Sequence, residues 1–217
     1  MELRKRFLRF VLPSIASMWA FSLYTIIAGI FVARGVGETA MAAVDLSMPF
    51  TSLVFAIGVA LAAGTSTLIS ISLGKGDLDR ARGLFSQNLA VTAAVSLAIT
   101  TLALIFLEDI ALFLGGTADT LRYVEEYVGT IAVFAVFFTV SYNMEVQVKA
   151  NGAPQISTVG VLSCGLMNVA LDALFVLVFR WGVWGAALAT GLAQVTSAVV
   201  FFVYFHTHRE RLRLEPF

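Results

Sequence analysis

The residues best suited to chemistry lie inside an apolar segment near the end of the chain. Asp172 is an ionisable side chain within the stretch from about Ile156 to Phe179, and Asn168 precedes it by four residues. In a helix, this spacing places both side chains on one face, one turn apart. Their carboxylate and amide oxygens are ligands that Na⁺ accepts, and the carboxylate can instead carry a proton. The pair therefore predicts a cation or proton site, and the alternative is an interhelical hydrogen bond with only a structural role.

Thr190 lies in the next apolar segment, about seven residues from its start, and we expect that segment to run in the opposite direction. Thr190 therefore reaches roughly the depth of Asp172. Its hydroxyl either completes the same polar cluster or bonds to its own helix backbone, as membrane threonines commonly do. The sequence predicts simpler structural roles for two other acids. Asp45 is expected to cap a helix, and Glu145 to pair with Lys149 four residues later.

Apolar elements must hold these polar groups, and the composition predicts that the elements span a membrane. The chain has 217 residues, of which 59% are hydrophobic and 13% charged, and its mean hydropathy is +0.90. Soluble domains carry about 25% charged residues, and a helix needs about 20 apolar residues to cross a bilayer. The predicted fold class is an all-α membrane protein with a single lobe of six transmembrane helices and a basic tail, 206–217. The expected spans are 10–32, 46–73, 84–107, 123–148, 156–179 and 183–205.

Basic residues predict the orientation of these spans. If the N-terminus is cytoplasmic, the cytoplasmic segments carry 11 Lys and Arg residues and the outer loops carry 3. This asymmetry predicts that both termini are cytoplasmic, in a prokaryotic plasma (inner) membrane. Pro49 is expected near the start of its helix, where proline costs least. Small residues four apart predict close helix packing along two stripes, Ala56, Ala60 and Gly64 on the second span and Gly185, Ala189 and Ala193 on the sixth.

Several function classes are excluded by what the sequence lacks. The chain balances 14 basic against 14 acidic residues, so a nucleic-acid partner is not expected. Its single cysteine, Cys164, allows no disulfide within the chain. It has no P-loop, no serine-nucleophile elbow and no Cys/His cluster for zinc. The chain is therefore not expected to be an enzyme or to bind a cofactor, and active transport would have to draw on an ion gradient or a separate energising subunit.

Four stretches in a fixed order carry a resemblance to a known family. Gly58–Asp77 reads GVALAAGTSTLISISLGKGD, and Gly-Ala-Pro begins at Gly152. Met167–Phe175 reads MNVALDALF, and Gly182–Thr190 reads GVWGAALAT. Together these stretches resemble the multidrug and toxic compound extrusion (MATE) family of the flippase-like superfamily. The resemblance covers the chain from Pro13 to the tail.

The resemblance implies an antiporter that exports small organic, often cationic, compounds as Na⁺ or H⁺ enters, by alternating access. It also implies that Asn168, Asp172 and Thr190 form the cation site, and it leaves the substrate-binding residues unknown. The family commonly has an aspartate on the first helix, in a pattern like Tyr-Asn-x-x-Asp. In this chain the pattern would begin at Tyr24, and Ala28 stands at the aspartate position. One carboxylate of the expected pair is therefore missing, which leaves the choice between Na⁺ and H⁺ open.

The length of the chain matches half of the resembled transporters, which usually have twelve helices in two lobes. A homodimer or a second six-helix lobe would complete such a transporter, unless the chain is a truncated product or a fragment. Two other interpretations stay open. One is a lipid-linked saccharide flippase of the same superfamily, although the spans carry few Lys or Arg to meet a pyrophosphate. The other is a membrane subunit that does not transport.

Overall fold

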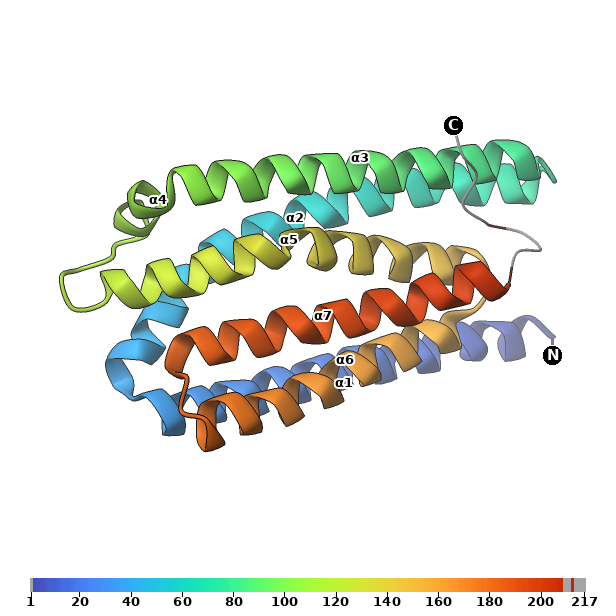
Figure 1. Ribbon diagram of the computed structural model, residues 1–217. Coiled ribbons are helices and arrows are strands. Elements are labelled where there is room, and N and C mark those ends of the chain that lie inside the picture. Colours follow the sequence, from blue (N-terminus) through green and yellow to red (C-terminus); the bar gives the residue numbers. More distant parts are fainter. Residues whose placement is uncertain (1, 209–211, 213–217) are drawn as a thin grey trace.

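The computed structural model describes the backbone of residues 2–208 and 212, and the side chains of the first helix mainly from Ser22 onward. In this part of the chain all regular elements are helical, and the long helices run up and down in chain order (Figure 1). The elements are α1 (Glu2–Val36), α2 (Glu38–Gly74), α3 (Leu78–Ile105), α4 (Leu107–Phe113), α5 (Leu121–Ala150), α6 (Pro154–Asp172), the π-helix η1 (Ala173–Val178) and α7 (Gly182–Thr207).

Five helical segments are long and apolar enough to cross a membrane: α2, α3, α5, α6 together with η1, and α7. In α1 the apolar stretch among the described side chains, Ser22–Val36, is shorter. Each predicted apolar segment falls on one of these six helical segments, and the predicted all-α membrane fold is confirmed. Most of the predicted basic tail lies outside the described residues, since α7 ends at Thr207.

The helices extend beyond their apolar segments, and this corrects two predictions on α2. This helix begins at Glu38, and its N-cap is Gly37, whose φ of 93° is readily adopted only by glycine. Asp45 therefore lies inside the helix, exposed, and is not its N-cap. Pro49 is likewise an interior residue, where it removes one backbone hydrogen bond. Hydropathy detects only the apolar part of a helix and does not include a polar first turn. Glu38 is stable in that turn because a negative charge near a helix N-terminus is favoured by the helix dipole.

The short helix α4 was not predicted, because its residues follow directly on the apolar run of α3. It has seven residues, with two acids in its first turn. Ala111 faces the protein, whereas the side chains of Leu112 and Phe113 are 52% and 89% exposed.

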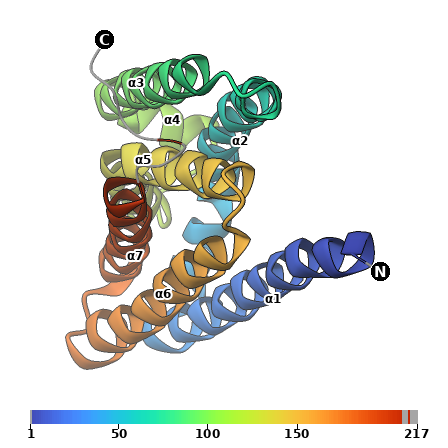
Figure 2. The same cartoon turned by 90° about the vertical axis from the view of Figure 1, so that its right-hand side faces the viewer.

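Helix α5 occupies the middle of the lobe. It packs against α2, α3 and α7, and it makes smaller contacts with α4 and α6. Figure 2, which views the bundle nearly end-on, shows α5 between the α2–α3 pair and α7, with α6 and α1 forming the opposite side. Figures 1 and 2 show α1 and α6 side by side, and α6 also packs against α7. We call the end where α1 begins the N-terminal end, and the other the α4 end.

The core has an apolar cluster at each end of the lobe. At the α4 end it joins residues of α2, α3, α4, α5 and α7, including Phe50, Val128 and Ile131. At the N-terminal end it is built around Phe85 and Phe205, whose ring centroids are 4.6 Å apart. Both clusters draw on helices that are distant in sequence, which holds the lobe together along its length.

A row of buried polar side chains joins α3 to α5 between these clusters. Asn88 Nδ2 donates to Asn143 Oδ1 at 2.8 Å, and Asn143 Nδ2 donates to Thr92 Oγ1 at 2.9 Å. One and two turns further along, the hydroxyls of Ser96 and Thr139 bond to each other. Interhelical hydrogen bonds of this kind contribute about 0.6 kcal/mol each in a membrane. The sequence did not predict this seam, because small polar residues in a span do not reveal their partners.

Candidate functional site

Asp172 and Asn168 lie at the end of α6, with both side chains inside the protein. Their exposed fractions are 1% and 2%. Helix α6 is covered by α1 on one side and by α7 on the other, so the shared face predicted from the four-residue spacing is buried between helices. The structure thus places this polar pair within the lobe rather than on its surface.

Three oxygen atoms of this pair have no hydrogen-bond partner among the described residues. They are both carboxylate oxygens of Asp172 and the amide oxygen of Asn168. A buried oxygen without a partner is costly, and more so when it carries charge. A proton on the carboxylate removes its charge, and a hard cation such as Na⁺ could take the same oxygens as ligands. The purely structural alternative, a satisfied interhelical hydrogen bond, does not account for these oxygens.

Thr190 of α7 contacts the pair. Asn168 Nδ2 donates to Thr190 Oγ1 at 3.3 Å, and Thr190 Oγ1 donates to the carbonyl oxygen of Ala186 at 3.0 Å. The two alternatives for this threonine therefore occur together. Because the amide nitrogen of Asn168 is engaged with α7, its amide oxygen is the atom left for another ligand.

Tyr127 of α5 is a further neighbour of the pair, which its local sequence does not indicate. Its side chain is 7% exposed, and it lies close enough to Asp172 for an electrostatic interaction. Within α5 it belongs to the same buried cluster as Val124 and Ile131, so its spacing is that of an ordinary core residue. Its hydroxyl, a polar tip on an apolar helix face, was the signal that could have identified it.

The helix changes form directly after Asp172. Residues 173–178 form η1, in which the N–H of Phe179 bonds to the carbonyl oxygen of Leu174, five residues earlier, at 2.9 Å. Such wide turns are rare and are frequently found at functional sites. The sequence ALFVLV does not distinguish this segment from an α-helix, since hydrophobic pattern does not encode the hydrogen-bond register.

Helix α1 brings the missing aspartate position to the level of the site. Tyr24 lies against Gly165 of α6, and Gly35 lies against Val176 of η1. The two contacts are eleven residues apart on α1 and also eleven residues apart on the α6–η1 segment. The two helical segments therefore run parallel and in register. Ala28, one turn after Tyr24, therefore lies at the level of the Asn168 turn. The described residues supply one carboxylate here instead of two.

The two stripes of small residues differ in their surroundings. The stripe on α7 is buried, and a methyl group added at Gly185 would lie 3.2 Å from Cβ of Phe175. Close packing is confirmed there. The stripe on α2 is exposed in this chain, and a methyl group at Gly64 would meet nothing within 4 Å. The exposed members are Ala56, Ala60 and Gly64.

The donor set suits a monovalent cation or a proton. Among the described residues, no three His, Cys, Asp or Glu side chains gather where they could hold a metal ion. The candidate site instead combines one carboxylate with neutral amide and hydroxyl oxygens. Transition metals are bound through thiolate or imidazole ligands in most protein sites, and neither is present in this set.

Comparisons with known proteins agree with this architecture. The family model described as MatE matches residues 13–174. The multidrug export protein MepA of Staphylococcus aureus (strain bovine RF122 / ET3-1) is 28% identical over 201 residues, which cover 93% of this chain and 45% of MepA. MepA of Staphylococcus haemolyticus (strain JCSC1435) is 26% identical over 208 residues, covering 96% and 46%.

Solved structures share the fold. A crystal structure of MATE in complex with MaD3S aligns with a TM-score of 0.91 at 23% identity, covering 97% of this chain and 48% of that one. A multidrug resistance MATE family transporter of the MOP superfamily, in an outward-facing conformation, aligns with a TM-score of 0.90 at 24% identity, covering 97% and 47%. This chain thus spans about half the length of the relatives it matches. The family model covers more than half of the chain. This protein therefore belongs to the MatE family, as its sequence resemblance predicted.

Proposed function

We propose that this chain is one lobe of a cation-coupled antiporter that exports organic compounds by alternating access. The observation that carries the proposal is the set of three unpartnered oxygens on Asp172 and Asn168, buried between α6 and its neighbours. A proton or Na⁺ would bind at this site, with Thr190 holding Asn168 in place. The relatives named as multidrug export proteins support the substrate class.

Ion binding would act on helix packing through the charge of one residue. Asp172 is the last residue of α6 and precedes η1, and η1 contacts α1 through Val176 and Gly35. A bound proton or Na⁺ neutralises the buried carboxylate, so it favours whichever packing of α6, η1 and α1 buries that group best. A ligand can shift a conformational equilibrium only by its difference in affinity between two states. Here the difference in affinity for the ion between the two packings would arise from the desolvated charge of the Asp172 carboxylate.

A complete transporter would need a partner for the exposed stripe on α2. Small residues allow a second helix to approach closely, and no described residue of this chain covers Ala56, Ala60 and Gly64. A second copy or a second lobe with an even number of spans would keep the same orientation and form a parallel repeat. Solved relatives about twice as long support this arrangement.

The proposed orientation places both termini in the cytoplasm of a bacterial inner membrane. The 11-to-3 distribution of basic residues supports it. The N-terminal end of the lobe would then face the cytoplasm, and Asp172 would lie in the outer half of the membrane. In the described helices Lys and Arg lie near the helix ends, so nothing in the spans favours a saccharide pyrophosphate over an organic cation.

The test is transport by the Asp172→Asn variant in liposomes, with ethidium as the probe and a Na⁺ or H⁺ gradient imposed one at a time. We expect the variant to insert normally and to lose gradient-driven dye movement. Asp45→Asn is the matched control, because it makes the same substitution at an exposed acid of α2 and should leave transport unchanged. Dye movement that is equal in Asp172→Asn and in the unmodified chain would refute the proposed ion site.

A further inference from the structure

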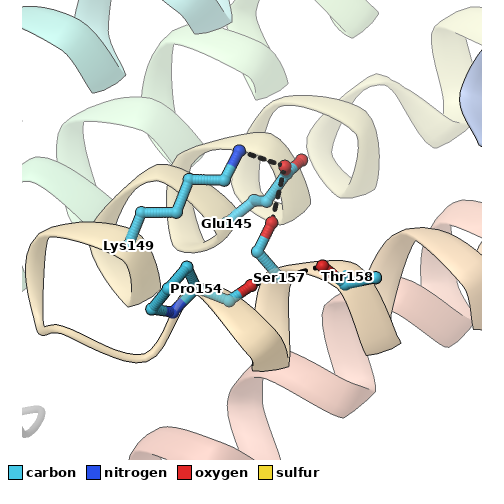
Figure 3. Close-up of polar contacts among 5 residues, drawn as sticks. All are labelled: Glu145, Lys149, Pro154, Ser157 and Thr158. Atoms are coloured by element: carbon cyan, nitrogen blue, oxygen red, sulfur yellow. Dashed lines mark hydrogen bonds and ion pairs between the residues drawn. The ribbon is translucent and has the colours of Figure 1, made fainter. Parts of the chain in front are cut away.

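A second carboxylate lies inside the membrane region at the N-terminal end of the lobe. Glu145 is five residues from the end of α5, about 7.5 Å along the helix axis. Its Oε1 accepts a hydrogen bond from Lys149 Nζ at 2.7 Å, which confirms the predicted ion pair. The same oxygen accepts a hydrogen bond from Ser157 Oγ of α6 at 2.9 Å. Figure 3 shows both donors reaching this one carboxylate oxygen from different helices.

The two donors differ in how firmly they are held. Ser157 is fully buried in the first turns of α6, so its hydroxyl is fixed toward Glu145. The Lys149 side chain is 35% exposed, whereas that of Glu145 is 15% exposed. A lysine ammonium on a flexible four-carbon stem can swing into the aqueous interface while its stem stays on the protein. Lys149 is therefore the partner that can leave this carboxylate, whereas Ser157 stays hydrogen-bonded to it.

An aromatic side chain lies one helical turn before the carboxylate, since Tyr142 precedes Glu145 by three residues on α5. The Tyr24 ring of α1 lies against Gly165, eight residues further along α6 than Ser157, and is not part of this group. The Tyr142 ring packs edge-on against Phe55 of α2, with centroids 4.9 Å apart, and the Phe55 side chain remains 44% exposed. Aromatic faces attract cations, most strongly in desolvated surroundings. Helix α5 thus places a carboxylate and an aromatic ring within one turn of each other, and Phe55 of α2 packs on that ring.

We propose that Glu145, Ser157 and Tyr142 form a second binding site, which takes the charged nitrogen of a monovalent organic cation, and that Lys149 occupies it as a tethered competitor. The inference rests on the proposed export of organic cations and adds a site separate from Asp172. In the proposed orientation the site lies near the cytoplasmic surface, where a compound bound for export enters. An incoming cation exchanges with the Lys149 ammonium, so the charge on Glu145 stays compensated throughout.

A simple structural ion pair makes the opposite prediction for one variant. If Lys149 only stabilises the fold, its removal cannot improve ligand binding. If Lys149 competes for Glu145, removing its charge while keeping its bulk must tighten binding. Lys149→Met is this variant, since methionine preserves an unbranched apolar stem.

The experiment measures ethidium binding by fluorescence to the purified full chain in lipid nanodiscs, without any ion gradient. We expect Lys149→Met to lower the Kd several-fold and Glu145→Gln to raise it about tenfold, because a charge-assisted contact is lost. The double variant should bind as weakly as Glu145→Gln. Arg122→Met is the matched control, since Arg122 forms an i,i+4 ion pair with Glu126 on the same helix at the α4 end, and its loss should leave the Kd unchanged.

Several results would overturn the inference. They are a Kd for Lys149→Met equal to or higher than that of the unmodified chain, an unchanged Kd for Glu145→Gln, or no ethidium binding by either the unmodified chain or Lys149→Met. The first result decides the question even if Glu145→Gln fails to fold. Because binding is measured without a gradient, these outcomes are independent of the Asp172→Asn transport test, so the two proposals can fail separately.

Discussion

The contact between Gly160 of α6 and Phe201 of α7 allows a quantitative test of how the site is held. A methyl group at Gly160 would meet Cζ and Cε1 of the ring well inside van der Waals contact, and Cε2 at 3.1 Å. Ordinary contacts of this kind lie at 3.4–4 Å. The ring belongs to a fully buried cluster with Phe85 and Phe205, so it has little room to move away.

The expected cost of Gly160→Ala follows from two opposing contributions. Overpacking a core costs about 1–3 kcal/mol. Replacing a glycine inside a helix by alanine gains about 0.5–1 kcal/mol. The midpoints of these ranges leave a net loss of about 1 kcal/mol in the free energy of unfolding, which lowers Tm by about 2–5 °C in a chain of this size. Since Gly160 sets the α6–α7 distance, the 3.3 Å contact between Asn168 and Thr190 should weaken as well.

Gly64→Ala on α2 is the matched control, because it makes the same chemical change where the added methyl meets nothing within 4 Å. It should keep only the helix-propensity gain and raise Tm slightly. The assay is thermal unfolding of both variants in one detergent, followed by circular dichroism. If Gly160→Ala is as stable as Gly64→Ala, the Phe201 ring is free to shift, and the argument that this contact fixes the helix spacing is wrong.

Three further variants test other parts of the lobe. Asn143→Ala removes the amide that pairs with Asn88 and should cost about 1–3 kcal/mol, seen as a lower Tm; an unchanged Tm would show that the seam is not stabilising. Ala28→Asp adds a carboxylate at the level of the ion site and should make Tm rise with Na⁺ concentration, and a Tm independent of Na⁺ contradicts this. Gly35→Ala should push α1 away from η1 and lower Tm more than Gly29→Ala, whose added methyl meets nothing within 4 Å; equal values would mean that this contact adjusts freely.

Several features of this protein could be predicted from local sequence. A span of about 20 apolar residues has few alternatives to a helix in a membrane, because its backbone groups must bond within the segment. The six apolar stretches were therefore sufficient to predict the all-α lobe. Asp172 and Asn168 could be placed on one helix face because their four-residue spacing acts within a single helix. The same rule predicted the ion pair of Glu145 and Lys149, which is confirmed.

Other features depend on contacts between helices. The ends of α2 were misplaced because a helix continues into polar residues that hydropathy does not detect. Tyr127 reads as a core residue in its own helix, and only the packing of α5 beside α6 brings it near Asp172. The π-helix η1 is set by a hydrogen-bond register that an apolar sequence does not specify.

The environment of each acid was likewise decided by the tertiary structure. The sequence by itself determined that Asp172 and Glu145 lie within helices in the membrane region, and which neighbours share their own turns. Packing against other helices determined that the Asp172 oxygens are left without partners while Glu145 receives a hydroxyl from α6. Spacing along one helix fixes its own side chains, but whether a buried oxygen finds a donor depends on the neighbouring helix, whose register is settled only when the bundle assembles.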